Sequence, residues 1–464
     1  MKETSKKGEG WTLTLALTVC SAAIGGTFQY GYNISIINAP TSHLQKFINE
    51  TCVRRWGTAL GPTQVTVIWT VIVSSFSLGG LFGSLLAGPM AIRFGRKGAL
   101  LLNNCFLLLS AVFVLSSRSA GSFEMVILAR LLVGVNAGVS MNVQPMYFGE
   151  SAPKDLRGAV TFSSAVFTAL GILLGQVTGL TEVLGSESVW PYLLASNALP
   201  GLVQLLTLPW FPESPRYLLI DKGDSKACIQ ALKRLRACSV FDSEMEEILQ
   251  ERTGTGEVRA KTMWELFADR SLRRQLCTVM AASSAMMLCG NDSIYFYASY
   301  IFQEAGIPLE KIQYVAIGTG ACEFTSAVVC NLLIERVGRR LLLAGVTGIL
   351  PAELFDQMAR PAAYMVAGSM MWLNLFLMGM AFPFIVNGLG QFCFIPFGGV
   401  CVAGCLFIGF TLPETKGRTL AEITKEFDKR NEKVTSNGFL KCGQRKQSQS
   451  LTDQTAEYLE IEKV

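Results

Sequence analysis

Charged residues are scarce in this 464-residue sequence. Asp, Glu, Lys and Arg together make up 16% of it, whereas a soluble domain commonly carries about 25%. There is one histidine, His43, which excludes a metal site built from several histidines, and no C-x-x-C spacing is present that would hold zinc. The low charge over the whole length indicates that lipid surrounds most of the chain.

Cysteines that could form a disulfide framework are also lacking, although the sequence has 13 of them. Cys52 lies in a loop without an obvious partner, and six others lie inside apolar runs, where a cysteine behaves as a small hydrophobic residue: Cys105, Cys289, Cys322, Cys330, Cys401 and Cys405. The Gly-Thr run from Thr253 to Glu257 has no P-loop lysine, which disfavours an ATP-driven pump or a soluble enzyme. We therefore expect no enzyme activity, cofactor, metal or nucleic-acid partner.

The sequence is rich in apolar runs of roughly 20 residues, the length that crosses a ~30 Å hydrocarbon core. The first of these runs continues without a signal-peptide cleavage site and is interpreted as a span. The predicted spans are 12–37, 66–90, 99–117, 123–147, 159–181, 190–210, 276–302, 313–334, 361–386 and 391–412. The predicted domains are a six-helix bundle (1–211), a cytosolic helical linker (212–272), a shortened helical bundle (273–427) and a disordered cytosolic tail (428–464).

Basic residues in the loops set the orientation of these spans. Lys and Arg precede the first span, follow the second and fourth, and are frequent in the insert after the sixth, so these segments are predicted to be cytosolic. The loop after the first span is then extracellular, and it holds the sequon Asn49-Glu-Thr51, which makes Asn49 a candidate glycosylation site. Both chain termini are expected on the cytosolic side.

Three short patterns occur twice and in the same order. Arg93-Phe-Gly-Arg-Lys97 returns as Arg336-Val-Gly-Arg-Arg340, the Glu150 and Arg157 pair returns as Glu353 and Arg360, and Pro212-Glu-Ser-Pro-Arg216 is echoed by Pro413-Glu-Thr-Lys-Gly417. Each pattern alone is a weak signal. Their shared order indicates a duplicated six-span unit.

The distances between the copies show that the second unit is shorter. The first patterns are 243 positions apart, the second 203 and the third 201, so about 40 residues are missing between Arg340 and Glu353. A 12-residue helix in that interval extends about 18 Å, too little to cross a bilayer. We expect Leu341 to Leu350 to dip into the membrane and return; in the alternative, the segment crosses with distortion and the last two spans invert.

Five ordered motifs carry a resemblance to a known family: Phe28-Gln-Tyr-Gly-Tyr-Asn33, Arg93-Phe-Gly-Arg-Lys97, Pro212-Glu-Ser-Pro-Arg216, Glu335-Arg-Val-Gly-Arg-Arg340 and Pro413-Glu-Thr-Lys-Gly417. With the two halves and the long insert, they resemble the facilitative hexose (glucose/fructose) transporters of the major facilitator superfamily, class II branch. The resemblance implies an all-α membrane fold of two pseudo-symmetric six-helix halves. The second half would lack the ninth span and half of the tenth, leaving about ten full spans and a re-entrant segment.

The resemblance also implies a sugar site near the membrane midplane. Buried amides, carboxylates and aromatic rings inside spans suit sugar hydroxyls and ring faces. The candidate substrate-binding residues are Gln176, Asp292, Asn291, Tyr30, Glu323, Gly348 and Trp372. An interhelical hydrogen bond for Gln176, helix capping for Asp292 and core packing for Tyr30 are the structural alternatives.

The charged residues of the repeated motifs are interpreted as a cytosolic gate that closes the inner mouth by salt bridges, as the resemblance implies. The gate candidates are Arg93, Arg96, Glu150, Arg157, Glu213, Glu335, Arg339, Arg340, Glu353, Arg360 and Glu414. In the alternative they only anchor helix ends and set the topology.

The resemblance implies facilitative transport of glucose or fructose across the plasma membrane by alternating access. The partners are then a small sugar and the lipid bilayer. Because of the missing residues, a non-transporting splice form or an incomplete gene model is the alternative. Proton-coupled sugar symport is a less favoured one, suggested by the two carboxylates, Asp292 and Glu323, inside spans.

Overall fold

The computed structural model describes residues 11–153, 156–236, 244–246, 248–249, 261–269, 272–337, 350–356 and 358–411, and this part of the chain contains helices and no strands. The first half holds α1 (Leu13–Ile24), α2 (Thr27–Ser35), α3 (Thr41–Trp56), α4 (Pro62–Ala120), α5 (Glu124–Ser151), α6 (Arg157–Thr178), α7 (Trp190–Ala195) and α8 (Ala198–Thr207). η2 (Leu208–Trp210) follows α8, and the segment predicted as the linker holds η3 (Tyr217–Asp221), α9 (Ser225–Arg236) and α11 (Met263–Ala268). The second half holds α12 (Arg273–Leu288), α13 (Asn291–Phe296), α14 (Ala298–Glu304), α15 (Leu309–Val337), α16 (Leu350–Leu354), α17 (Arg360–Leu389), η5 (Gly390–Cys393) and α18 (Phe394–Thr411).

Several predicted spans are broken or joined in the structure. The first predicted span breaks into α1 and α2 at Gly25 and Gly26, where the backbone N–H of Thr27 donates to the side-chain carbonyl of Gln144 over 2.6 Å. A Cβ at Gly26 would overlap that carbonyl, so only glycine lets α5 approach the break. The second and third predicted spans form one long α4 with a kink at Gly95, whose φ is +82°.

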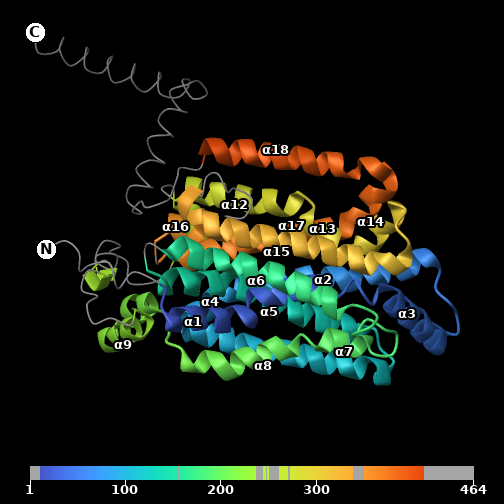
Figure 1. Cartoon of the computed structure of the whole chain (residues 1–464), viewed down its shortest axis with the longest axis horizontal. Helices are drawn as coiled ribbons and strands as arrows, with labels where there is room; N and C mark the ends of the chain where they lie inside the picture. Colours follow the sequence, from blue (N-terminus) through green and yellow to red (C-terminus); the bar gives the residue numbers. More distant parts are fainter. Residues whose placement is uncertain are drawn as a thin grey trace, which may run out of the picture.

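The two halves lie side by side with their helices along the long axis of the molecule (Figure 1). α3 lies at one end of the bundle, whereas the linker helix α9 and α16 lie at the other end. Because the basic loops adjoin the end with α9, this is the end predicted to face the cytosol, and we call it the cytosolic end.

Small residues let α17 of the second half approach α4 and α5 of the first. A Cβ at Gly80 would overlap the indole of Trp372, and one at Gly88 would overlap the sulfur of Met365. On α17 itself, a Cβ at Gly368 would overlap the amide of Asn142. Close backbone approach at small residues is the usual way in which helices associate within lipid.

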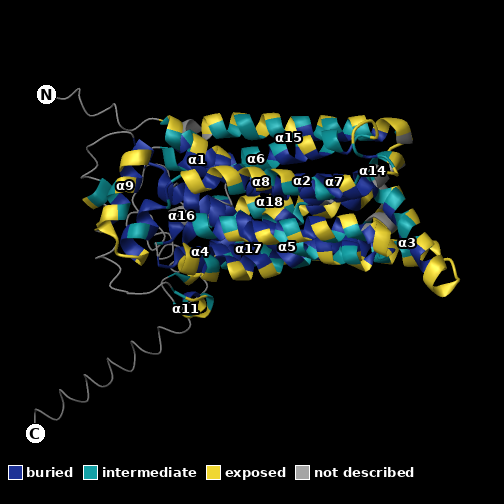
Figure 2. Cartoon of the chain, turned by 90° about the horizontal axis from the view of Figure 1, so that it is seen from below, coloured by how far each residue is buried: buried dark blue, intermediate teal, exposed yellow. Residues whose placement is uncertain are grey.

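α15 is the helix that precedes the predicted dip, and it is the most exposed of the helices that could span a membrane among the described residues. This helix ends, and α16 and α17 begin, at the cytosolic end of the bundle, as expected if the chain dips rather than crosses between them (Figure 1). The predicted dip itself, Leu341 to Leu350, lies outside the described residues except for its last position. α15 packs along α6. Of the 18 residues in its most apolar stretch, only 11% are buried, against 44–72% in the five other helical segments among the described residues that could span a membrane (Figure 2). The open side of α15 is consistent with the absence of the ninth span.

Within the described residues, six helical segments are long and apolar enough to cross a membrane. They are Leu13–Ser35, Pro62–Ala120, Glu124–Ser151, Arg157–Thr178, Glu310–Leu333 and Arg360–Phe382, and Phe394–Gly409 is a shorter apolar helix. The 59 residues of α4 account for two predicted spans, and α12 to α14 and α7 to α8 are spans interrupted by turns. The predicted all-α, multi-pass architecture is confirmed.

Candidate functional site

A cavity of about 680 Å³ lies between the two halves, toward the end of the bundle that carries α3. This volume is in the range of small-molecule binding sites. Polar side chains from both halves line it: Ser35, Asn38, His43, Thr66, Thr70, Gln176, Gln303 and Gln313. Trp69, Phe296, Tyr297 and Phe382 supply apolar wall, a mixture that suits a ligand with hydroxyl groups around a carbon ring.

Gln176 is the predicted substrate residue that the structure places in this cavity. It lies on α6, and its side-chain carbonyl adjoins Gly320 of α15 so closely that a Cβ there would overlap it. That carbonyl oxygen is buried and has no hydrogen-bond partner among the described residues. An unpartnered buried acceptor is costly, and a ligand hydroxyl would satisfy it.

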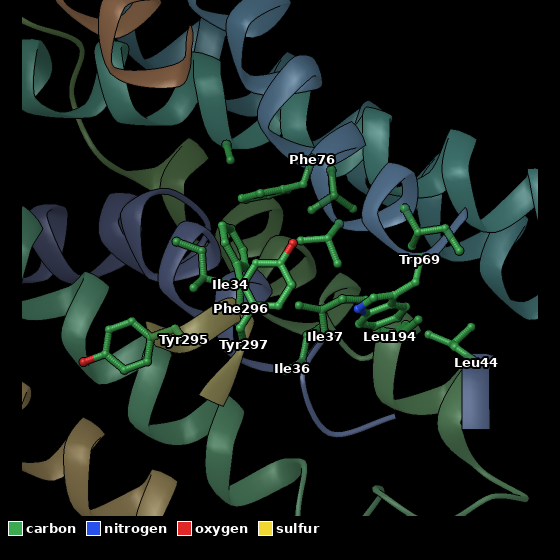
Figure 3. Packing of buried hydrophobic residues seen from close by; sticks show 14 of the residues in the cluster. Ile34, Ile36, Ile37, Leu44, Trp69, Phe76, Leu194, Tyr295, Phe296 and Tyr297 are labelled. Carbon is green, nitrogen blue, oxygen red and sulfur yellow. The ribbon is translucent and has the colours of Figure 1, made fainter. Parts of the chain in front are cut away.

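Below the cavity, on its cytosolic side, aromatic side chains of both halves pack together. The ring of Trp372, which is 0% exposed, lies edge-on to the rings of Tyr30 and Phe76, with centroid distances of 5.4 Å to each. Phe76 and Tyr297 belong to the same buried cluster, part of which is seen in Figure 3. The structure thus brings the predicted residues Tyr30 and Trp372 into contact although they lie in different halves.

The two predicted carboxylates lie next to these rings. The hydroxyl of Tyr30 donates to Oδ2 of Asp292 over 3.0 Å, a hydrogen bond that joins α2 of the first half to α13 of the second. The hydroxyl of Tyr295 donates to Glu323 on α15. Two other candidates cannot be placed, because the side chain of Asn291 and all of Gly348 lie outside the described residues.

A buried ion-pair network occupies the cytosolic end of the bundle. Arg96, just after the kink of α4, is 0% exposed, and its Nε lies 2.9 Å from Oε2 of Glu150 on α5. Its guanidinium also donates to Asp221 of η3 over 2.8 Å, and it lies 4.8 Å from the centroid of the Tyr217 ring. Glu150 further accepts a hydrogen bond from the hydroxyl of Ser214 over 2.5 Å.

Arg360 connects this network to the second half. It begins α17, and its guanidinium lies 3.9 Å from Oε1 of Glu150. Glu150 therefore contacts an arginine of each half, Arg96 and Arg360. This arrangement can hold the cytosolic ends of the halves together, and a movement that separates the halves must break the Glu150–Arg360 contact.

Glu213 fixes the kink of α4 from the linker side. Its carboxylate accepts the backbone N–H groups of Arg96 and Lys97 over 3.1 and 3.0 Å, which are free because the helix restarts there. Burial raises the pKa of Glu213, and the backbone hydrogen bonds from Lys97 and Ser214, with the charge of Arg96, oppose the rise. The residue thus acts as a helix cap as well as a neighbour of the ion-pair network.

The remaining gate candidates are Arg93 and Arg157, which the structure describes, and five residues that it describes in part or not at all. Arg93 is exposed, with its guanidinium 5.5 Å from the centroid of the Phe94 ring, and Arg157 begins α6. The structure does not describe the side chains of Glu335 and Glu353, nor any part of Arg339, Arg340 and Glu414. Asp221 also joins the network, although no motif in the sequence points to it; it lies five residues beyond the Pro212–Arg216 motif and belongs to no repeated pattern.

Gly95 offers a test of the kink. Gly95→Ala places a Cβ against the carboxylate of Glu213 at a φ of +82°, so we expect the free energy of unfolding to fall by about 2 kcal/mol. Gly57→Ala is the comparison at an open site, because Gly57 has nothing within 4 Å of a Cβ and its φ of +71° with a ψ of 2° is the left-handed helical region, where a Cβ costs about 1 kcal/mol. Gly95 has a ψ of 174°, in a region that only glycine adopts readily, so its variant carries more backbone strain as well as the overlap with Glu213. Equal losses in denaturant unfolding of the two purified variants would contradict a specific role for the Glu213 cap.

The candidate glycosylation site lies at the end of the bundle opposite to the ion-pair network. Asn49 is on α3, and its side-chain carbonyl accepts the backbone N–H of Leu60 over 3.0 Å. Thr51 of the same sequon is buried at 2% exposed. The position agrees with the predicted extracellular side, and modification would have to precede the folding of α3 against its neighbours.

Two helical halves, a cavity between them and a closed network at one end define a membrane transporter of the major facilitator fold. The model of the family "Sugar (and other) transporter" matches residues 18–351 and 344–427, two stretches that meet inside the interval where the motif offsets place the missing residues. The chain belongs to this sugar transporter family, which confirms the family resemblance of its motifs.

Similar proteins support the same placement. The chain is 54% identical to human solute carrier family 2, facilitated glucose transporter member 11, over 90% of this chain and 93% of that protein. It is 40% identical to the human member 5 over 93% of this chain and 95% of that protein, and 37% identical to the human member 9 over 92% and 87%. Among solved structures, the proton:xylose symporter XylE bound to 6-bromo-6-deoxy-D-glucose has a TM-score of 0.75 at 19% identity, covering 89% of this chain and 99% of that one.

Proposed function

We propose that this protein carries hexoses, glucose or fructose, down their gradient by alternating access. The observation that carries the proposal is the cavity between the halves, where the acceptor of Gln176 is left without a protein partner. Relatives that are 54% and 40% identical to it are named as facilitated glucose transporters, which supports a hexose as the transported sugar. The sugar is transported unchanged, and we propose no enzyme activity.

The arrangement of contacts suits one state of an alternating cycle. The cavity lies toward the end with α3, while Glu150, Arg96 and Arg360 hold the cytosolic ends together. Opening to the cytosol would exchange the Glu150–Arg360 contact for water. Since the states of such a carrier differ by only a few kcal/mol, a network of this size can decide which one is populated.

The shortened second half does not remove the residues that this proposal uses. Gln176 lies on α6, Gly320 on α15 and Trp372 on α17. All three helices are present, and they pack across the interface between the halves, α15 on α6 and α17 on α4. We therefore favour a transporting protein over the non-transporting alternative.

The proposal is tested by exchange of radiolabelled sugar in liposomes that contain the purified chain. We expect labelled D-glucose or D-fructose to exchange across the membrane in a saturable way, with L-glucose as the matched control for leakage. Equal rates for D- and L-glucose, with no effect of D-fructose, would reject hexose transport.

We further propose that the protein resides in the plasma membrane with both termini in the cytosol and a glycan on Asn49. Digestion of the protein from a eukaryotic membrane with an N-glycosidase is expected to increase its mobility on a gel. Asn49→Gln should show the same mobility without digestion, whereas Asn33→Gln should still shift, because Asn33 is 1% exposed inside α2. A digested wild type that does not move would contradict the glycan.

A further inference from the structure

The contact between Tyr30 and Asp292 is the feature from which a further property follows, and it rests on the proposed transport function. Tyr30 is on α2 of the first half and is 4% exposed, and Asp292 is on α13 of the second half and is 8% exposed. Their hydrogen bond of 3.0 Å therefore crosses the interface that must open and close during transport. It lies one helical turn below Phe296, which lines the cavity, so it belongs to the floor of that cavity.

A second carboxyl lies close enough to interact with the first. Glu323 of α15 accepts a hydrogen bond from Tyr295, whose ring in Figure 3 points away from the other labelled side chains. Glu323 and Asp292 interact electrostatically, and each of them also interacts with both tyrosines. Asp292 is buried and Glu323 is half-buried, and two like charges at such positions repel each other, which favours a proton shared by the pair.

The other ionisable groups on the helices around Asp292 are few. Cys322 on α15 interacts with Tyr295, and Tyr297, at the start of α14, donates its hydroxyl to the backbone carbonyl of Gly379. α12 and α17, which also pack on α13, carry their ionisable residues at their cytosolic ends: Arg273, Arg274, Cys277, Arg360 and Tyr364. Among the described residues, the ionisable groups with an established interaction with Asp292 are Tyr30, Tyr295 and Glu323.

We propose that Asp292 and Glu323 form a proton-binding site that controls how firmly the two halves are held together beneath the cavity. When Asp292 is ionised, the hydrogen bond from Tyr30 is charge-assisted and strong. When Asp292 holds the proton, the same hydrogen bond is between neutral groups and weaker, so the halves separate more readily. The proton stays bound to the carboxyl during this change, and no net proton transport is required.

The first measurement needs no sugar. Infrared difference spectra of the purified protein in lipid, recorded between about pH 5 and about pH 8, should show the carbonyl stretch of a protonated carboxylic acid that grows as the pH falls. The band should be altered or lost in both Asp292→Asn and Glu323→Gln. A wild-type spectrum without a pH-dependent band overturns the proposal, whatever the protein transports.

The second measurement is the equilibrium exchange of labelled hexose with equal pH on both sides of the membrane. We expect wild-type exchange to become about fivefold faster at the acid end of the range, because protonation weakens one charge-assisted hydrogen bond. Asp292→Asn should be fast at every pH. Tyr30→Phe keeps both carboxyls, so it should retain the infrared band, while its exchange should be fast at every pH. If Asp292→Asn does not fold, Tyr30→Phe still tests whether the hydrogen bond to Asp292 slows exchange.

Tyr32→Phe is the matched control for Tyr30→Phe. Tyr32 lies on the same helix, but its hydroxyl bonds Ser196 and Thr178, which are in the same half, so the pH dependence should remain as in the wild type. The proposal that the proton on Asp292 and Glu323 controls the exchange rate is overturned in either of two cases. The wild-type exchange rate does not vary with pH, or the rate of Tyr30→Phe varies with pH as much as that of the wild type. A protein with the infrared band but without any hexose exchange retains the proton site and contradicts only the proposed transport.

Discussion

Glu150→Gln is expected to lower the free energy of unfolding by about 3–5 kcal/mol, because it removes the charge that Arg96 and Arg360 both face. Arg96 is 0% exposed and would keep only Asp221 as an acidic partner within the contacts described above. Placing an arginine charge in a poorly solvated site without its main counter-ion costs far more than an exposed pair gains. Thermal and denaturant unfolding of the purified variant in detergent measures the effect.

Glu124→Gln is the control on the same helix. Glu124 pairs with Arg55 over 2.6 Å, but the side chains are 48% and 34% exposed, and an exposed pair contributes about 0–1 kcal/mol. The two variants remove the same chemical group from opposite ends of α5. Similar losses of stability in both would contradict the view that burial makes the cytosolic network important.

Gln176→Ala has the second large expected effect, this time on transport. We expect kcat/KM for the transported hexose to fall roughly 10–100-fold, which corresponds to the loss of a buried hydrogen bond worth about 1–3 kcal/mol. The protein itself should unfold as the wild type does or slightly later, because the side-chain oxygen that is removed has no partner within the described residues. Initial uptake rates at several sugar concentrations measure the change.

Gln313→Ala is its matched control. Gln313 lines the same cavity but at the rim, where its amide exchanges hydrogen bonds of 3.3 Å with Thr181. Solvent replaces such contacts readily, so the uptake rate should change less than about threefold. Equal losses in both variants would mean that the sugar does not bind next to Gln176.

The sequence was most informative where function is written into repeated motifs. Arg96 and Glu150 belong to patterns that occur twice, and Arg360 is the second copy of Arg157, so the pattern predicted residues that the structure brings into one network. The offsets between the copies likewise located the shortening between Arg340 and Glu353, and the family model is matched in two stretches that meet there. Whether these residues act as a gate remains a prediction.

Contacts between distant helices could not be predicted from the sequence. Asp221 has no repeated counterpart, and nothing local shows that η3 folds back onto Arg96. Arg130 was also missed: it is 3% exposed inside α5, donates to the backbone carbonyl of Asn33 over 3.1 Å and lies 4.7 Å from the centroid of the Phe76 ring. Such partners depend on how α2, α4 and α5 pack, which periodicity does not specify.

Uptake into liposomes shows whether this chain, with its shortened second half, transports hexoses. Initial uptake of labelled D-glucose and D-fructose should be compared between this chain and a version in which the 40 missing residues are inserted between Arg340 and Glu353 from the human facilitated glucose transporter member 11. We expect saturable uptake by this chain within about tenfold of the restored version, since the residues around Gln176 are unchanged. Uptake by the restored version alone, with this chain no faster than empty liposomes, would contradict it.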